Sequence, residues 1–283
     1  MDIEHLKQWI GREERAGDCA SPVPLAGLAA LLDHETPPWI EGEVPPLGHW
    51  LYFLPHARQS AIDVDGHPKR GDFLPPVPLP RRMWASGEVV FHTHVPIGAA
   101  IERRSRIADV TARTGSSGPL VFVTLRHDIF CDGALAIEER QDLVYRGPGD
   151  APARAVEVPV ADATRIVTPD PVALFRYSAL TFNGHRIHYD RDYARNAEGY
   201  PGLVVHGPYA ATLLVDHFLR ETPGAIVKRF SFRARQPLFD TAPFSLNLRR
   251  AGAAAEVWTT DAAGRLAMTG TIDFKGEQAC AMS

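Results

Sequence analysis

The sequence predicts an α+β fold in which an antiparallel sheet wraps around a helix, and it predicts that this unit occurs twice. Two observations carry the prediction. In each half of the chain a helix-like segment precedes several β-like runs, and a stretch rich in Gly, Pro and Ala separates the halves. We therefore expect an N-terminal unit at 1–150, a connector at 151–171 and a C-terminal unit at 172–283.

Composition limits the classes of function. With 283 residues, 45% of them hydrophobic, the chain can bury a substantial core. A net charge of -4 gives no global attraction to nucleic acid or to an anionic membrane, so local basic residues must hold any phosphate-bearing ligand. The N-terminus lacks the apolar segment of a signal peptide or membrane anchor, and three cysteines form no CxxC pair. We expect a soluble, cytoplasmic protein.

The N-terminal half begins with helical patterns and continues with strands. His5 to Arg15 is amphipathic and Leu25 to Leu32 is apolar, and both predict helices. The β-branched and alternating runs that follow predict four strands. They are 85–95, 100–113, 119–130 and 134–145.

The C-terminal half repeats this plan. The helix predicted at Pro208 to Arg220 is apolar on most of its circumference, which favours a helix buried inside a curved sheet. Pro208 suits the first turn, so the amides of Gly207 and Tyr209 are candidate free donors at the positive helix end. A tight turn without function is the alternative reading of His206-Gly207-Pro208. The strands predicted after this helix are 225–234, 244–250, 254–260 and 265–274.

A cluster of polar side chains lies about one helix-length before this helix. Its members are Asn183, His185, Arg186, His188, Tyr189 and Asp190. A histidine-bearing loop that leads to free helix N–H groups can place a base beside a site for an anionic oxygen. The cluster is therefore the candidate site.

Residues 177–190, followed by 199–208, resemble the hydratase motif of the MaoC-like (R)-specific enoyl-CoA hydratases. The form Asn-Gly-His-Arg-Ile-His is similar to the subgroup of mesaconyl-C4-CoA hydratases, itaconyl-CoA hydratases and type 2 hydroxyacyl-thioester dehydratases. The resemblance covers the C-terminal half in detail, and 81–110 looks like the substrate-shaping, non-catalytic repeat of such proteins. It implies a double hotdog fold, which agrees with the repeat read from the residues.

The family pattern places an aspartate and a histidine five residues apart, and these positions fall on Asn183 and His188. An amide cannot act as a base. The resemblance therefore implies that His188 is the acid/base group, and we expect Asn183 to orient the attacking water. Gly207 matches the family glycine whose backbone N–H meets the thioester oxygen. Asp190 could orient His188 or cap the helix that follows, and we favour the cap.

The substrate contacts are expected at Arg186, Tyr189 and His206. Arg186 could pair with a substrate carboxylate or could fix the loop backbone, and the residues leave both readings open. For the CoA phosphates we expect Arg233 and Arg235, which share one face of a strand opposite Phe230 and Phe232. A solvated sheet face is the alternative for this pair. A second basic group, at 103–106, could serve the same ligand.

The activity implied is that of a hydro-lyase: reversible hydration of a short α,β-unsaturated acyl-CoA thioester. A C5 dicarboxyl group, mesaconyl-C4 or itaconyl, is expected, the latter as in itaconate degradation. Dehydration of linear 3-hydroxyacyl thioesters on CoA or acyl carrier protein, thioesterase activity, and acyl-CoA binding without turnover are the alternatives. We expect no metal, although His92 and His94 alternate on one strand face, and no redox cofactor. A homodimer is compatible with the fold.

Overall fold

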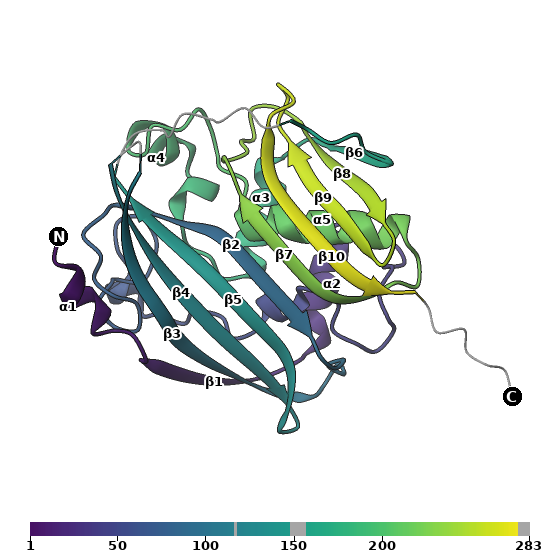
Figure 1. Cartoon of the computed structure of the whole chain (residues 1–283), viewed down its shortest axis with the longest axis horizontal. Coiled ribbons are helices and arrows are strands. Elements are labelled where there is room, and N and C mark those ends of the chain that lie inside the picture. Colours follow the sequence, from purple (N-terminus) through teal and green to yellow (C-terminus); the bar gives the residue numbers. More distant parts are fainter. Residues whose placement is uncertain (116–117, 148–156, 277–283) are drawn as a thin grey trace, which may run out of the picture.

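A computed structural model describes residues 1–115, 118–147 and 157–276. Its strands form one antiparallel ten-stranded sheet in the order β1-β3-β4-β5-β2-β7-β10-β9-β8-β6 (Figure 1). The strands are β1 (Glu13–Cys19), β2 (Arg81–Phe91), β3 (Ala100–Gly115), β4 (Gly118–Cys131), β5 (Ala134–Arg146), β6 (Ala163–Val167), β7 (Ile226–Ala234), β8 (Phe244–Ala251), β9 (Ala254–Thr260) and β10 (Leu266–Lys275). The α-helices are α1 (Ile3–Lys7), α2 (Pro22–Leu31), α3 (Pro171–Leu180), α4 (Arg191–Asn196) and α5 (Gly207–Glu221).

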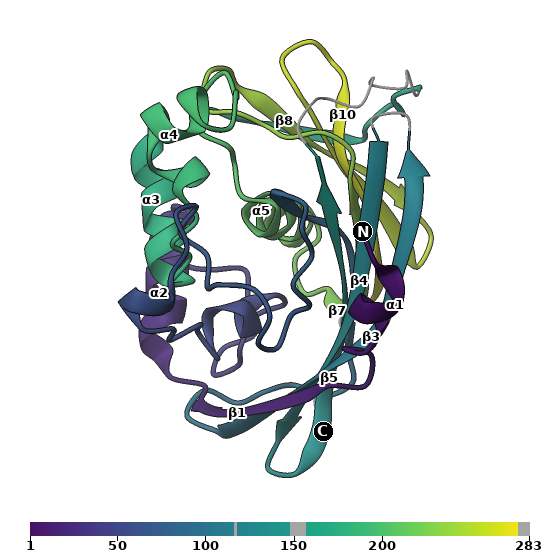
Figure 2. The same cartoon turned by 90° about the vertical axis from the view of Figure 1, so that its left-hand side faces the viewer.

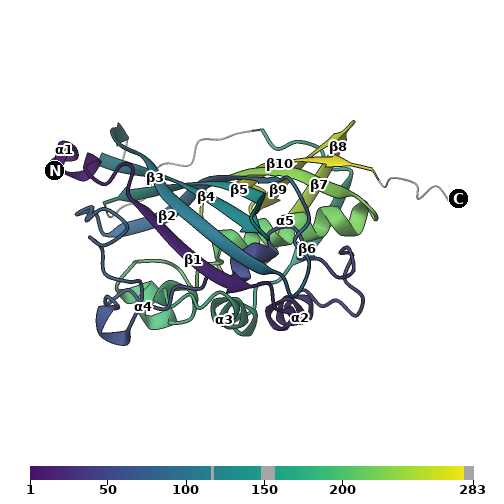
Figure 3. The ribbon, with the colours of Figure 1, turned by 90° about the horizontal axis from the view of Figure 1, so that it is seen from below.

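Helix α5 lies inside the curve of the sheet, as its apolar circumference predicted. Every residue from Tyr209 to Leu219 is buried. The helices α2, α3 and α4 form a row on the far side of α5 from the sheet (Figures 2 and 3). The site is therefore enclosed between the sheet and this row of helices, with the start of α5 between them.

The two halves join through backbone pairing of β2 with β7, from Ser86 opposite Arg233 to Val90 opposite Arg229. One hydrophobic core also includes residues of both halves. In the N-terminal half, α2 contacts mainly α3 rather than the strands. Residues from 47–80 pack against these strands instead, with Val77 in one core cluster with Val110, Val123 and Leu143, and the cavity opens beside them.

Two expectations on local structure need correction. Residues 5–15 do not form one helix, because α1 ends at Lys7 and a turn containing Gly11 at φ 86° leads into β1, which pairs with β3 at the sheet edge. Part of the expected connector forms the edge strand β6, paired with β8. Residues 151–156 of that connector lie outside the described residues. All eight predicted strands are confirmed to within a few residues of their ends.

Two features of the described residues bear on environment. Cys19 and Cys131 are free, and Cys280 lies outside the described residues. Within the described ranges, the helices are too short or too polar to cross a bilayer.

Candidate active site

A cavity of about 1450 Å³ opens between the two halves of the chain. Its walls come from the loop at residues 55–80, here called the covering loop, from the motif loop at 181–189, from the start of α5 and from the inner face of the sheet. Ordinary small-molecule pockets measure roughly 300–1,000 Å³. The cavity can therefore accept a ligand larger than a typical metabolite.

His188 lies on the wall of this cavity with 7% of its surface exposed. Its Nδ1 lies 2.8 Å from the carbonyl oxygen of Val204. A carbonyl can only accept, so Nδ1 carries the hydrogen and Nε2 has a free lone pair. Among the described residues no group hydrogen-bonds to this Nε2. Burial lowers the pKa of His188 to about 4, which keeps the ring neutral and able to act as a base.

His206 lies behind His188 rather than in the cavity. The two rings stack with centroids 3.7 Å apart, and His206 Nε2 lies 2.8 Å from Ser178 Oγ. His206 is fully buried and is not part of the cavity wall. The expectation that His206 contacts substrate is therefore corrected: this residue supports the ring of His188.

Gly207 begins α5 and lines the cavity. The preceding residue, His206, makes no side-chain capping bond, so no side chain occupies the first amides of the helix. A Cβ added to Gly207 would meet no atom within 4 Å. The glycine is thus not demanded by packing. Because Gly207 lies in the cavity wall at the start of the helix, its N–H is a candidate donor to a polar atom of a ligand.

Asn183 also lines the cavity, and its side chain has a local task. Oδ1 accepts a hydrogen bond of 3.0 Å from the backbone N–H of His185, which closes the turn of the motif loop. The amide nitrogen of Asn183 remains as a donor. Asn183 can therefore hold a water by donating from this nitrogen, and Oδ1 keeps a second lone pair that can accept.

Arg186 is paired within the protein. Its Nε and Nη2 donate to Asp190 Oδ2 at 3.1 and 2.8 Å, and Nη1 donates to the carbonyl oxygen of Val64. Asp190 also caps α4 by accepting from the N–H of Tyr193, as favoured from the sequence. Of the two readings of Arg186, this geometry supports the one that fixes the loop. Tyr189 lines the cavity and donates its hydroxyl to the carbonyl oxygen of Gly184.

Arg233 and Arg235 lie outside the cavity wall. Along β7, Phe230 and Phe232 are buried and Arg233 is exposed, and Arg235, just beyond the strand, is exposed as well. The alternation therefore places the arginines opposite the phenylalanines, and their contact with the CoA phosphates stays a prediction. Of the second basic group, Arg103 does line the cavity. His92 and His94 also do not converge, because they pair with Glu138 and Glu43 respectively.

The family model for hydroxyacyl-thioester dehydratase type 2 matches residues 47–240, a span that contains the covering loop, the motif loop and α5. The chain belongs to this family. Mesaconyl-C4-CoA hydratase of Chloroflexus aurantiacus is 47% identical to this chain over 274 residues, which cover 95% of this chain and 97% of that protein. Both descriptions are of enzymes that add or remove water. This member of the family is accordingly a hydro-lyase.

Two solved structures share the fold of this hydro-lyase. A MaoC-like dehydratase superposes with a TM-score of 0.70 at 14% identity, covering 95% of this chain and 98% of its own. A Mycobacterium tuberculosis protein described as a double hotdog superposes with a TM-score of 0.57 at 13% identity, covering 94% and 96%. The double hotdog prediction is confirmed.

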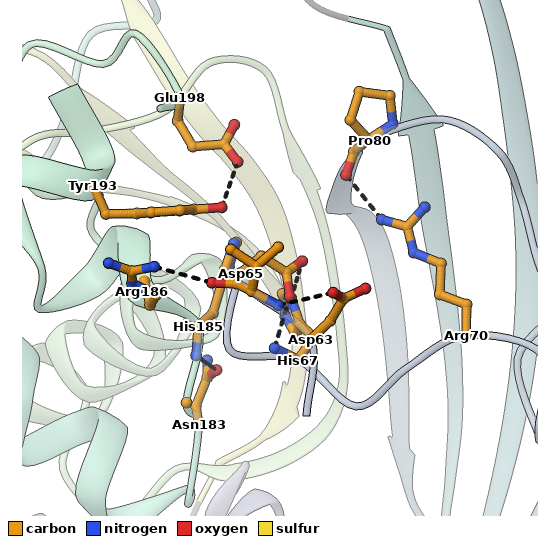
Figure 4. A network of polar contacts seen from close by, with 12 residues as sticks. Asp63, Asp65, His67, Arg70, Pro80, Asn183, His185, Arg186, Tyr193 and Glu198 are labelled. Carbon is orange, nitrogen blue, oxygen red and sulfur yellow. Dashed lines mark hydrogen bonds and ion pairs between the residues drawn. The ribbon is translucent and has the colours of Figure 1, made fainter. Parts of the chain in front are cut away.

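The covering loop brings two residues to this hydro-lyase site that the sequence reasoning missed (Figure 4). Asp65 Oδ2 lies 3.1 Å from His67 Nδ1, and the ring centroid of His67 lies 4.0 Å from that of His185. Ligand atoms of Asp65, His67 and His185 lie within 4.8 Å of one another, so within the described ranges these three could approach one metal ion. A signal was available: Asp-Gly-His in a Gly- and Pro-rich loop is a polar cluster in the part of a fold that often carries function.

Proposed function

We propose that this enzyme hydrates a short α,β-unsaturated acyl-CoA thioester, reversibly, with His188 as the acid/base group. The observation that carries the proposal is a neutral, buried imidazole whose free Nε2 lies in the same cavity wall as the amide at the start of α5. Hydration needs both a base for water and a donor for the thioester oxygen.

The reaction follows from these positions. His188 Nε2 takes a proton from water while the water oxygen bonds to the β-carbon, and the electron pair of the double bond moves towards the thioester oxygen. The N–H of Gly207, at the positive end of α5, stabilises the negative charge on that oxygen. The proton on His188 then passes to the α-carbon, which restores the neutral imidazole. Asn183 donates a hydrogen bond that orients the water.

For the acyl group we propose a C5 dicarboxyl chain of the mesaconyl-C4 or itaconyl kind. The similarity to mesaconyl-C4-CoA hydratase over nearly the whole chain supports this choice. Because Asp190 already neutralises Arg186, the free carboxylate would meet another cation. Arg103 in the cavity wall is the candidate, since its contact with Glu14, at 3.5 Å, is looser than the 2.8 Å contact of Arg186 with Asp190. Water and the thioester suffice for the reaction, so the proposed mechanism uses no metal or redox cofactor. We also propose that the enzyme acts in the cytoplasm.

The second candidate is dehydration of linear 3-hydroxyacyl thioesters, on CoA or on acyl carrier protein. The matched family model, described as a hydroxyacyl-thioester dehydratase, favours it. The chemistry at His188 and Gly207 would be the same in reverse, and the two candidates differ only in the acyl chain that the cavity selects.

Mass spectrometry of the products separates these candidates. Purified enzyme is incubated with mesaconyl-C4-CoA, itaconyl-CoA and crotonyl-CoA side by side. Faster gain of water on a dicarboxyl thioester supports the first proposal, faster turnover of crotonyl-CoA supports the second, and release of free CoA without water addition contradicts both.

The role of His188 is tested by His188→Ala, with His5→Ala on the exposed helix α1 as the matched control. Loss of the base should lower kcat by about 10²–10⁴-fold while His5→Ala behaves like the wild type. Hydration by His188→Ala at a wild-type rate would show that another group is the base.

A further inference from the structure

Four histidine side chains lie in a row along the site. Ring centroids are 4.0 Å apart between His67 and His185, 5.3 Å between His185 and His188, and 3.7 Å between His188 and His206. A proton on one ring disfavours a proton on the next, because like charges repel. A proton that enters this row during a reaction therefore needs a negative charge nearby.

The motif loop does not supply that charge. Its family aspartate position holds Asn183, and the oxygen of this amide already accepts from the N–H of His185. His188 and His206 contact a carbonyl oxygen and a hydroxyl respectively. Among the described residues, the carboxylate that contacts the row is Asp65, which the N-terminal half contributes.

Asp65 holds His67 in one orientation. Its Oδ2 accepts from His67 Nδ1, and its Oδ1 accepts from the backbone N–H of His67 at 2.8 Å. Burial raises the pKa of the Asp65 carboxyl, but the hydrogen bonds from His67 and the nearby imidazoles lower it further, to below its usual range. Asp65 is thus a carboxylate, and it fixes the hydrogen of the neutral His67 ring on Nδ1.

The loop that carries Asp65 is locked onto the motif loop. The carbonyl oxygen of Asp65 accepts from the N–H of Arg186 at 2.9 Å. Gly66 and Gly184 touch backbone to backbone, so closely that a Cβ on Gly66 would lie 1.8 Å from the carbonyl oxygen of Gly184. The charge of Asp65 is therefore held at a fixed place relative to His185 and His188.

Other charged groups also face the row. Arg82 opposes a proton on His67 and on His185, and Arg70 opposes one on His67. Tyr193 of α4 lies close enough to Asp65 for their charges to interact. His67 lowers the pKa of His188, and the carbonyl of Val204 raises it. The cations and the neighbouring rings act against protonation of the row, so Asp65 is the charged group that favours it.

We propose that Asp65 and His67 form a positioning dyad that supplies the negative charge missing from the motif loop. The inference rests on the proposed hydration. When His188 has taken the proton of water and the oxygen has bonded to the β-carbon, His188 carries a positive charge. Asp65, fixed beside His67 and His185, offsets the repulsion from these rings and so stabilises this charge until the proton passes to the α-carbon. The dyad itself neither gains nor loses a proton.

Asp65→Asn removes the charge and keeps the size of the side chain. Asp63→Asn, on the same loop, is the matched control, because the Asp63 carboxylate accepts only from the N–H of Val64. We expect Asp65→Asn to lower kcat by about 10- to 100-fold with little change in KM. The acid limb of the kcat profile should move down by about 0.5 pH unit or more, because an imidazolium without its counter-charge forms less readily. The control should match the wild type in both.

A second readout does not depend on turnover. Histidine ring NMR signals are followed by pH titration in wild type, Asp65→Asn and Asp63→Asn. The protonation of the row should begin at lower pH only in Asp65→Asn. If the wild type hydrated no thioester, the proposed function would be wrong. The titration would still show whether the charge of Asp65 favours protonation of the histidine row.

Three results would overturn the dyad. One is an unmoved acid limb together with an unmoved titration in Asp65→Asn. Another is a wild-type kcat in Asp65→Asn protein that circular dichroism shows to be folded. The third is one equivalent of metal in the purified wild type that is absent from Asp65→Asn. Asp65, His67 and His185 would then be metal ligands, and Asp65 would not act as a counter-charge to the protonated row.

Discussion

The chemistry of the site depends on which nitrogen of His188 carries the hydrogen. The carbonyl of Val204 fixes that hydrogen on Nδ1, and burial keeps the ring neutral. A histidine in water would be half protonated near pH 6.5 and so would lose its base in mildly acidic solution. His188 is protected from this loss by its surroundings.

The protected state of His188 predicts an unusual pH dependence. In the proposed mechanism the neutral imidazole is the active form, and its pKa is lowered to about 4, first by burial and then by the neighbouring His67. We expect kcat/KM to stay level as the pH falls through about 6.5 and to decline only towards about 4. Short assays at each pH would measure this, with circular dichroism as a check on folding. A decline centred near 6.5 in folded enzyme would contradict the prediction.

Folding must be checked at each pH because the lowered pKa of His188 also reduces the stability of the folded chain in acid. The unfolded chain binds a proton at His188 below about pH 6.5, whereas the folded chain resists it until about pH 4. The stability contributed by the neutral ring is therefore lost as the pH falls between these values. His206, whose pKa is lowered first by burial and then by His188, acts in the same direction.

Gly207 gives a prediction that separates catalysis from stability. Alanine is a better helix former than glycine, and its methyl group would meet no atom of the protein. Gly207→Ala should fold at least as well as the wild type. In the proposed mechanism the thioester oxygen lies beside the N–H of Gly207, so an added methyl group crowds the bound thioester, and kcat/KM should fall by about 10-fold or more. Gly17→Ala in β1, where a Cβ is equally free, should leave kcat/KM unchanged.

Sequence reasoning at this scale located the motif loop but not its partners. The resemblance of the motif pointed to His188 and Gly207, and local spacing predicted the capping role of Asp190, which is confirmed. Asp65 could not be found in this way, because its contact with His67 and the site forms only when the covering loop packs on a loop far along the chain. For Arg233 and Arg235, alternation gives two faces of a strand but does not say which one faces the ligand.

Among the elements, the covering loop touches the motif loop at a tightly packed glycine, Gly66. Gly66 has a φ of 91°, and Gly98 has the same φ of 91°, but only Gly66 has a neighbour at its missing Cβ. Replacing either glycine with alanine strains the backbone by about 1–3 kcal/mol. Gly66→Ala must in addition push the two loops apart.

We therefore predict that Gly66→Ala loses most activity and that Gly98→Ala keeps it. Both variants should melt below the wild type, and the difference between them reports the contact with Gly184. Thermal unfolding and kcat/KM are the measurements. Equal activity in the two variants would show that the loops need not touch for catalysis.

Helix α5 was the element most fully predicted, since Gly207-Pro208 marks its start and its apolar circumference marks its burial. The segment at 5–15 was predicted wrongly. Its acidic and basic residues suit the surface of a helix as well as they suit an exposed edge strand. Pairing with β3 makes part of this segment the strand β1. Local pattern alone does not contain that pairing.

At the level of the whole molecule, the two halves share both a sheet and a core. Pairing of β2 with β7 is a set of backbone hydrogen bonds, and the largest hydrophobic core runs from Ala20 to Ile272. Unfolding of either half would therefore expose the core of the other half to solvent and break its backbone pairing. The repeat that the sequence predicts is therefore visible as topology, but it does not make two independent units.

Unfolding should accordingly be a single transition. In Trp258→Phe every remaining tryptophan lies in the N-terminal half, so fluorescence reports that half while far-UV circular dichroism reports both. Trp258 Nε1 is buried without a partner, so phenylalanine removes an unsatisfied donor. We expect the two midpoints to agree within about 2 °C. Two separated transitions would contradict the shared core.

The backbone contact between Gly66 and Gly184 also sets an order of events during folding. These residues lie far apart in the chain, and closing such a long loop is a slow, late step. Hairpins such as β3–β4 can form first because their partners are neighbours. In a refolding experiment the recovery of enzymatic turnover should lag behind the recovery of β-structure, and catalysis would serve as the reporter of the last contact made.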